Sequence, residues 1–362
     1  FKLGGHSLLA VSSMTKLASE GYRLTLADLY RSASVEALAR VAQQNHAQVE
    51  WEQCVVRIRE PQPGEPPLFL MHEYTGMEAY FAKLGMLMDE GLGVYGISSV
   101  PLDQLFLESM EEQAQRAANI IGRIQPQGAV HIAGWSYGGL LAYAVAMALQ
   151  ERGRNVEFLG LIDIRVNPTT RSVPTLCQLL VDNVAKLNQA NPGSSCLAQI
   201  WTQMEVLTAH HDFEGLWTLV SSVGGFESSL LHGFERITAR AFLERIQAHH
   251  KAMCTYSPPR SELPLHLYLA SERLRHSSVV LASDSDLGTC LGWDAVVPLT
   301  QISTFFVPGN HYSMLDDPAY ARQLAGSLSA HLRGQRNAYF EKHQNQSNQH
   351  AESLAPHTPF CQ

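Results

Sequence analysis

The chain has 362 residues, of which 45% are hydrophobic, and this is enough for one large core with a small additional domain. Its formal net charge is -8, and no basic run is interleaved with aromatic residues, which argues against a nucleic-acid-binding protein. The 6 cysteines form no CxxC pair, and no apolar stretch has the length of a signal or membrane-spanning segment. We expect a reduced, cytoplasmic protein with no metal site and no membrane contact.

The first residues carry a glycine motif, Leu3-Gly4-Gly5-His6-Ser7, that leads into a helical pattern. Ser7 is therefore predicted to be the first residue of a helix. There, exposed backbone N–H groups and the helix dipole would stabilise an attached phosphate, although a simple N-cap serine has the same local sequence. The apolar residues that define this helix are Leu8, Leu9, Val11, Met14, Leu17 and Ala18.

Two more helical stretches, one through Leu26–Tyr30 and one from Ser34, complete a small all-helical unit over residues 1–43. The chain opens without methionine and directly into this pattern, so we expect it to be the C-terminal piece of a longer polypeptide. Residues 44–53 are polar and are predicted to be a linker.

From residue 54 onward, short β-rich runs alternate with helical patterns. This alternation predicts an α/β domain over 54–333, with a mainly parallel sheet flanked by helices. The predicted strands are Cys54–Ile58, Leu68–Met71, Val94–Ile97, Val130–Ala133, Phe158–Ile162, Leu265–Leu269 and Thr304–Val307.

Ser136 is the candidate nucleophile. It is the centre of Gly134-Trp135-Ser136-Tyr137-Gly138, a GxSxG pattern that follows an apolar β run and precedes a strong helical pattern. This strand-turn-helix setting is what the motif requires, because the glycines allow a sharp turn that exposes the serine hydroxyl above the sheet.

A serine nucleophile needs a base and an acid that orients the base. His311 is the candidate base, since it follows the last predicted strand and a turn, and the expected chain order is Ser, acid, His. Asp163, at the end of the strand after the nucleophile's helix, is the favoured acid, and Glu272 is its rival. The backbone N–H groups of Tyr137 and Tyr74 are the candidate oxyanion donors.

The stretch between Asp163 and Pro264 interrupts the alternation with largely helical patterns. We interpret residues 167–260 as a lid over the active site, the alternative being an ordinary helical layer. Its histidine pairs, at 210–211 and 249–250, are interpreted as structural. The tail over 334–362 is rich in Gln, Asn, His and Ser and is predicted to be disordered.

Taken together, these motifs resemble the end of a nonribosomal peptide synthetase, in which a peptidyl carrier domain precedes a type I thioesterase domain. The run Phe1–Leu8 is similar to the carrier signature whose serine receives 4′-phosphopantetheine, and Leu26–Tyr30 is similar to its downstream segment. Carriers of this family have a helix before the signature, so the resemblance implies that the carrier in this chain is partial. The resemblance implies an α/β-hydrolase fold with a helical lid insertion, a phosphopantetheine arm on Ser7, and a triad of Ser136, Asp163 and His311.

In the family, a proline often follows the histidine of the loop that supplies an oxyanion donor. In this chain the corresponding histidine, His72, is followed by Glu73. The implied function is chain termination in antibiotic or siderophore biosynthesis: a peptidyl thioester is transferred to Ser136 and released by hydrolysis or by macrocyclisation. The implied partners are upstream synthetase modules of the same polypeptide and a phosphopantetheinyl transferase. The motifs are shared with terminal thioesterases of polyketide or mixed synthetases, which is the alternative. The sequence identifies neither the product nor the oligomeric state.

Overall fold

The computed structural model describes residues 34–44, 50–166, 173–182, 195–222, 234–272 and 290–334, with the single positions 13, 17, 24, 28, 29, 32 and 231. Ser7 and the tail beyond residue 334 lie outside the described residues. The predictions made for the phosphate attachment and for the tail therefore stay predictions.

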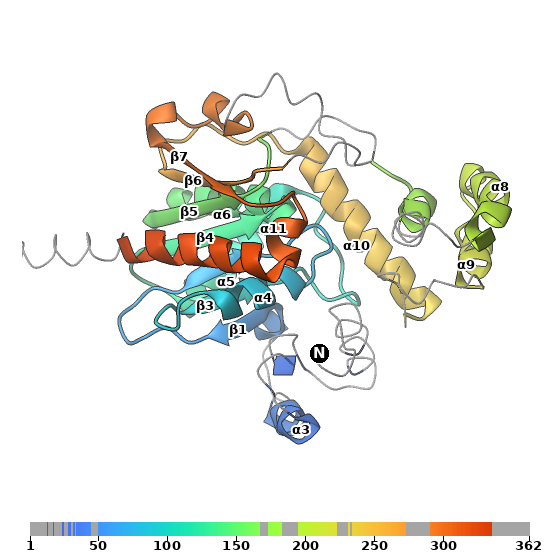
Figure 1. The fold of residues 1–362 in the computed structure, drawn as a ribbon, viewed down its shortest axis with the longest axis horizontal. Helices are drawn as coiled ribbons and strands as arrows, with labels where there is room; N and C mark the ends of the chain where they lie inside the picture. Colours follow the sequence, from blue (N-terminus) through green and yellow to red (C-terminus); the bar gives the residue numbers. More distant parts are fainter. Residues whose placement is uncertain are drawn as a thin grey trace, which may run out of the picture.

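Strands of the described part form a seven-stranded sheet in the order β1-β3-β2-β4-β5-β6-β7 (Figure 1). β1 is antiparallel to β3, and every other neighbouring pair is parallel. Each predicted strand is present, with ends that differ by at most a few residues. The observed bounds are β1 (Val55–Arg59), β2 (Leu68–Met71), β3 (Val94–Ile97), β4 (Val130–Trp135), β5 (Val156–Ile162), β6 (Leu265–Ala270) and β7 (Ile302–Val307).

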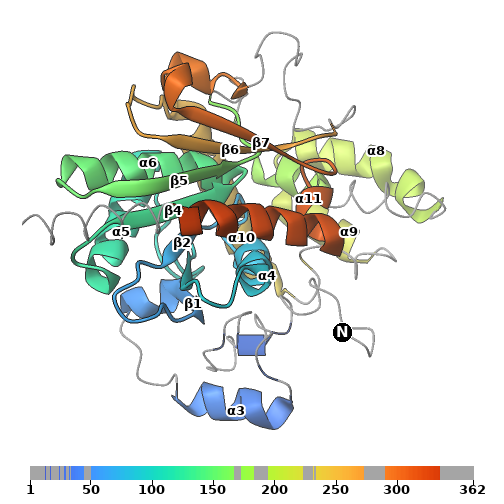
Figure 2. The same cartoon turned by 60° about the vertical axis from the view of Figure 1, so that its left-hand side comes forward.

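Helices cover both faces of the sheet (Figures 1 and 2). On β2, Phe69 and Met71 pack in one buried cluster with helices α5 (Met110–Ile124) and α6 (Tyr137–Glu151). The alternate residues Leu68 and Leu70 pack in a second cluster with α4 (Ala79–Leu87) and the C-terminal helix over 318–334. Burial on both faces explains why the strands are continuous apolar runs and not alternating ones.

The insertion after β5 is helical, as predicted. A helix over 176–182, α8 (Ser195–Ala209), α9 (Phe213–Ser221) and α10 (Arg236–Thr255) contribute to a third buried cluster. Figure 1 shows α10 running from the sheet domain out to α8 and α9. The first part of α10 packs in this third cluster, which we name the lid cluster after the predicted lid, whereas Ala252 and Tyr256 at its C-terminal end pack in the core cluster of α5 and α6. Helix α10 therefore connects the helical insertion to the body of the domain.

The region before the sheet differs in part from its prediction. Helix α3 (Val35–Gln44) lies where a helix was expected. A 3₁₀ helix, η2 (Glu50–Cys54), occupies the end of the predicted linker. Its Trp51 packs against the core cluster, with the Arg123 guanidinium 5.7 Å from the indole centroid. Partial burial of this aromatic side chain attaches the end of the predicted linker to the domain.

Short elements complete the description: the 3₁₀ helices η6 (Trp293–Ala295) and η7 (Leu299–Gln301), and helix α11 (Ser313–Asp316) after β7. Among the helices of the described part, none combines the length and the apolar character needed to cross a membrane.

Candidate active site

Ser136 occupies a strained turn between β4 and α6. Its φ is 54°, in the left-handed region that non-glycine residues rarely adopt, with ψ at -128°. The Ser136 N–H donates to the Ile162 carbonyl at 2.9 Å, which ties the turn to the end of β5. The nucleophile predicted from the motif therefore stands on a turn held by the neighbouring strand.

Backbone packing explains the glycines of the motif. A Cβ on Gly134 would lie 2.0 Å from the Gly138 carbonyl oxygen, and a Cβ on Gly138 would lie 2.7 Å from the carbonyl oxygens of Met71 and His72. Strand β4, the first turn of α6 and the end of β2 therefore approach one another backbone to backbone. No larger residue fits at either glycine without a backbone shift.

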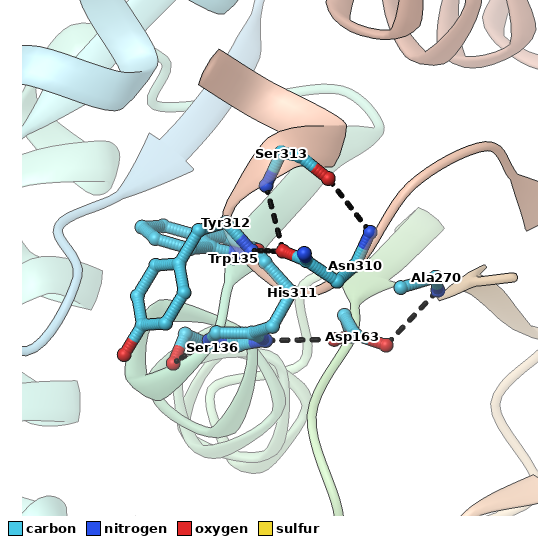
Figure 3. Close-up of polar contacts among 8 residues, drawn as sticks. All are labelled: Trp135, Ser136, Asp163, Ala270, Asn310, His311, Tyr312 and Ser313. Atoms are coloured by element: carbon cyan, nitrogen blue, oxygen red, sulfur yellow. Dashed lines mark hydrogen bonds and ion pairs between the residues drawn. The ribbon is translucent and has the colours of Figure 1, made fainter. Parts of the chain in front are cut away.

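His311 bridges the other two predicted residues (Figure 3). Its Nε2 lies 3.1 Å from Ser136 Oγ, and its Nδ1 lies 2.7 Å from Asp163 Oδ2. A carboxylate can only accept, so Nδ1 carries the proton toward Asp163. In neutral His311 this leaves the Nε2 lone pair facing the serine hydroxyl, which is the tautomer that a general base requires.

Asp163 is held by the adjacent strand β6. Its N–H donates to the Tyr268 carbonyl at 2.8 Å, and its Oδ1 accepts from the Ala270 N–H at 3.0 Å. The φ of Asp163 is 49°, a second left-handed residue at the site. The rival acid, Glu272, is exposed, and its backbone N–H donates to the Gly309 carbonyl at 2.9 Å. The carboxylate on His311 Nδ1 is therefore that of Asp163.

His311 is positioned by two neighbours that the sequence had not singled out. The Trp135 indole stacks on the imidazole, with centroids 5.0 Å apart and planes at 30°, and its Nε1–H donates to the His311 carbonyl at 3.2 Å. The Asn310 side-chain oxygen accepts from the N–H groups of Tyr312 and Ser313, each at 3.0 Å (Figure 3). Trp135 precedes Ser136 in the sequence and Asn310 precedes His311. Their adjacency to predicted site residues is the signal that could have identified them.

The candidate oxyanion donors lie on adjoining elements. Tyr137 is the first residue of α6, where backbone N–H groups have no intrahelical acceptor. Tyr74 belongs to the loop over residues 72–76, which follows β2 and which we name the oxyanion loop after the predicted donor. The Tyr74 ring meets the Tyr137 ring edge-on at 6.3 Å between centroids. The Glu73 carbonyl accepts from His72 Nδ1 and from the Gly76 N–H, both at 2.9 Å. Because the Glu73 carbonyl and the Tyr74 N–H belong to one planar peptide, these bonds fix the direction of that N–H.

A buried polar cluster lies beside the oxyanion loop. His72 and His249 stack with centroids 4.9 Å apart, and burial lowers the pKa of both, that of His249 to about 3. Arg245 is also buried, which lowers its pKa to about 10, while burial raises the pKa of Glu73. The structure thus brings His249, one of the histidines interpreted as structural, into contact with the candidate site. No signal in the sequence pointed there, because the contact depends on how α10 packs.

Comparison with known proteins identifies the domain. A family model described as a thioesterase domain matches residues 66–332. Malpibaldin synthetase of Mortierella alpina is 33% identical over 187 residues, which are 51% of this chain and 3% of that protein. The dimodular nonribosomal peptide synthase of Bacillus subtilis is 29% identical over 170 residues, which are 46% of this chain and 7% of that protein. The chain thus spans only a small part of the length of these relatives.

Solved structures share the architecture. A four-domain nonribosomal peptide synthetase bound to AMP and glycine superposes with a TM-score of 0.63 at 23% identity, over 91% of this chain and 24% of that one. The type II thioesterase BorB from the borrelidin biosynthetic cluster gives a TM-score of 0.52 at 17% identity, over 80% of this chain and 100% of that one. At these identities the likeness is one of fold, and it confirms the predicted α/β-hydrolase fold. With most of its length matched by the family model, the chain belongs to the thioesterase domain family.

Proposed function

We propose that this chain is the chain-terminating thioesterase of a nonribosomal peptide synthetase, with Ser136 as nucleophile, His311 as base and Asp163 as the acid that orients it. The observation that carries the proposal is the hydrogen-bonded series Ser136 Oγ, His311 Nε2, His311 Nδ1 and Asp163 Oδ2, with distances of 3.1 and 2.7 Å. The family match and the synthetase relatives support the substrate class, a peptidyl thioester.

The first half-reaction acylates Ser136. The Ser136 oxygen attacks the thioester carbonyl carbon while His311 Nε2 takes the hydroxyl proton, and Asp163 stabilises the imidazolium. The C–S bond then breaks, and the proton on Nε2 passes to the departing sulfur. The product is an ester between the peptide and Ser136.

The negative charge of the tetrahedral intermediate is stabilised by the backbone N–H groups of Tyr137 and Tyr74. The dipole of α6, whose first residue is Tyr137, acts in the same direction. Loss of one such donor typically lowers kcat on the order of 100-fold.

The second half-reaction releases the peptide. Water, or an amine or hydroxyl of the peptide itself, attacks the ester carbonyl and gives its proton to Nε2, which returns a proton to the Ser136 oxygen. Attack by water yields a linear acid, and internal attack yields a macrocycle.

The proposal includes the tether predicted from the sequence. When attached to Ser7, 4′-phosphopantetheine supplies the flexible thiol arm that carries the peptide. Upstream modules of the same cytoplasmic polypeptide would load that arm, and a phosphopantetheinyl transferase would install it. Incubation with such a transferase and coenzyme A is expected to add one phosphopantetheinyl group at Ser7, in a version of the chain extended upstream. A label on another residue, or no label, would refute the carrier assignment.

The test of the proposed function is product release from a panel of synthetic thioesters, followed by mass spectrometry. We expect turnover of peptidyl thioesters, as linear acids or macrocycles, and no turnover by Ser136→Ala. Preference for polyketide-type acyl thioesters over peptidyl ones would favour the terminal thioesterase of a polyketide or mixed synthetase instead. Undiminished release by Ser136→Ala would refute the catalytic assignment.

A further inference from the structure

Lid helix α10 binds the oxyanion loop through two consecutive histidines. His249 Nδ1 lies 2.8 Å from the Tyr74 carbonyl oxygen, and His250 Nδ1 lies 2.9 Å from the Tyr74 phenol oxygen. One loop residue is thus held by α10 at both its backbone and its ring. Tyr74 also packs against both the core cluster and the lid cluster, so it lies where the two meet.

The hydrogen bonds of His249 determine its tautomer. Burial lowers the pKa of His249 to about 3, so the imidazole is neutral at pH 7 and carries a single N–H. The Tyr74 carbonyl can only accept, so the proton is on Nδ1. The bare Nε2 then accepts from the Ser99 hydroxyl at 3.0 Å. The opposite tautomer would place a nitrogen lone pair against the carbonyl oxygen.

These bonds fix the backbone of Tyr74. The peptide before Tyr74 is held through the Glu73 carbonyl, which accepts from His72 and Gly76, and the peptide after it is held through its own carbonyl by His249. Since both peptide planes that meet at the Tyr74 Cα are held, its φ and ψ are fixed, and with them the direction of its N–H.

The His249 ring also packs against rings on both elements that carry the proposed oxyanion donors. Its centroid is 5.0 Å from that of Tyr137 and 4.9 Å from that of His72, with interplanar angles of 24° and 27°. A single side chain of α10 therefore contacts both elements that carry the proposed oxyanion donors.

We propose that His249 is a positioning residue of the oxyanion hole, through which lid helix α10 holds the Tyr74 peptide in its donor orientation. The inference rests on the proposed function, because it assigns Tyr74 as a donor. The oxyanion hole is then complete only while α10 is hydrogen-bonded to the oxyanion loop. Lid position and the chemical step are then coupled through one N–H···O bond.

A pair of substitutions separates this role from packing. An asparagine side chain places an amide N–H near the position of the imidazole Nδ1–H, whereas a glutamine places it near the position of Nε2. His249→Asn therefore keeps the bond to Tyr74, and His249→Gln loses it. Ile246→Ala is the matched control, because Ile246 is buried one turn earlier on α10, in the lid cluster, and its aliphatic side chain cannot donate a hydrogen bond to the loop.

The experiment measures kcat and KM for thioester hydrolysis, together with the affinity for a peptide boronic acid, which forms a tetrahedral adduct with a serine. We expect His249→Gln to lower kcat roughly 10- to 100-fold, with KM within about two-fold. Its affinity for the boronic acid should fall by a similar factor. His249→Asn should keep kcat within about five-fold of wild type, and Ile246→Ala should lower the melting temperature but not kcat.

A folded His249→Gln variant with wild-type kcat would overturn the inference, and so would His249→Asn impaired as strongly as His249→Gln. Ser136→Ala, assayed in parallel, tests the proposed function separately from the role of His249. ¹⁵N NMR of the histidine rings in the wild-type protein adds a test that needs no variant to fold. Protonation of His249 at Nδ1 is expected at pH 7, and protonation at Nε2 would contradict the proposed bond.

Discussion

Replacing Asp163 by asparagine is expected to inactivate the enzyme by reversing the tautomer of His311. The Ala270 N–H can only donate, and it lies 3.0 Å from Asp163 Oδ1, so the new amide must keep its oxygen there. The amide NH₂ then faces His311 Nδ1, which lies 2.7 Å from the other carboxylate oxygen in the wild type. Two donors cannot pair, so the imidazole proton moves to Nε2, and the base can no longer accept the proton of Ser136.

The expected loss in kcat is on the order of 10⁴-fold, or about 5.5 kcal/mol of transition-state stabilisation. Asparagine is the appropriate substitute because Asp163 has a φ of 49°, a conformation that asparagine tolerates better than alanine does. The melting temperature should therefore change by only a few degrees. The assay is single-turnover release of acid from a peptidyl thioester, with folding checked by thermal denaturation.

Glu272→Gln is the matched control, because Glu272 is the exposed carboxylate that the sequence left as a rival. This variant should retain wild-type kcat within about two-fold. Retention of more than a tenth of wild-type kcat by Asp163→Asn would show that Asp163 does not set the tautomer of His311, and so would a larger loss in Glu272→Gln than in Asp163→Asn.

Three further predictions concern stability and the setting of the base. The pKa of His249 is about 3 in the folded protein, against 6.5 for an ordinary histidine. Between these pH values the unfolded state binds one more proton at this residue than the folded state does. The free energy of unfolding should therefore fall as the pH drops through this window. His249→Asn should make urea titrations at pH 7, 6 and 5 less pH-dependent, by at most about 1.4 kcal/mol per pH unit, and an unchanged slope would contradict the assignment. Gly134→Ala, whose Cβ would lie 2.0 Å from a backbone carbonyl oxygen, should lower the free energy of unfolding by about 3 kcal/mol or more, as measured by chemical denaturation. Gly122→Ala, in open space on α5, should raise the free energy of unfolding by about 0.5–1 kcal/mol. Trp135→Phe keeps a ring on His311 but loses the N–H donor at 3.2 Å, so kcat should fall roughly five-fold at constant KM; a larger change in KM than in kcat would argue for a substrate contact instead.

Local sequence patterns were sufficient to predict most of the fold and the three residues that the structure brings together at the candidate site. The strands could be recognised because burial on both faces makes them short apolar runs, and β2 and β3 were predicted to the residue. Ser136 was identifiable because its turn needs glycines at 134 and 138, where no Cβ fits. His311 followed from its place after the last strand.

Contacts between distant segments could not be predicted in this way. The choice between Asp163 and Glu272 depends on β6, which holds the Asp163 carboxylate through the Ala270 N–H. The contact of His249 with Tyr74 spans 175 residues and depends on the packing of α10, which no local pattern encodes. For the same reason, histidine pairs in a helical insertion gave no indication of which one would face the site.

In the proposed mechanism, Ser136 carries the acyl group between the two half-reactions. The direct measurement is rapid-quench mass spectrometry after mixing the protein with a peptidyl thioester, with the acylated residue located by peptide mapping. We expect a transient mass gain of one acyl group on the peptide that contains Ser136, absent from Ser136→Ala. An acyl group on a different residue, or one that persists in Ser136→Ala with undiminished release, would contradict the proposed mechanism.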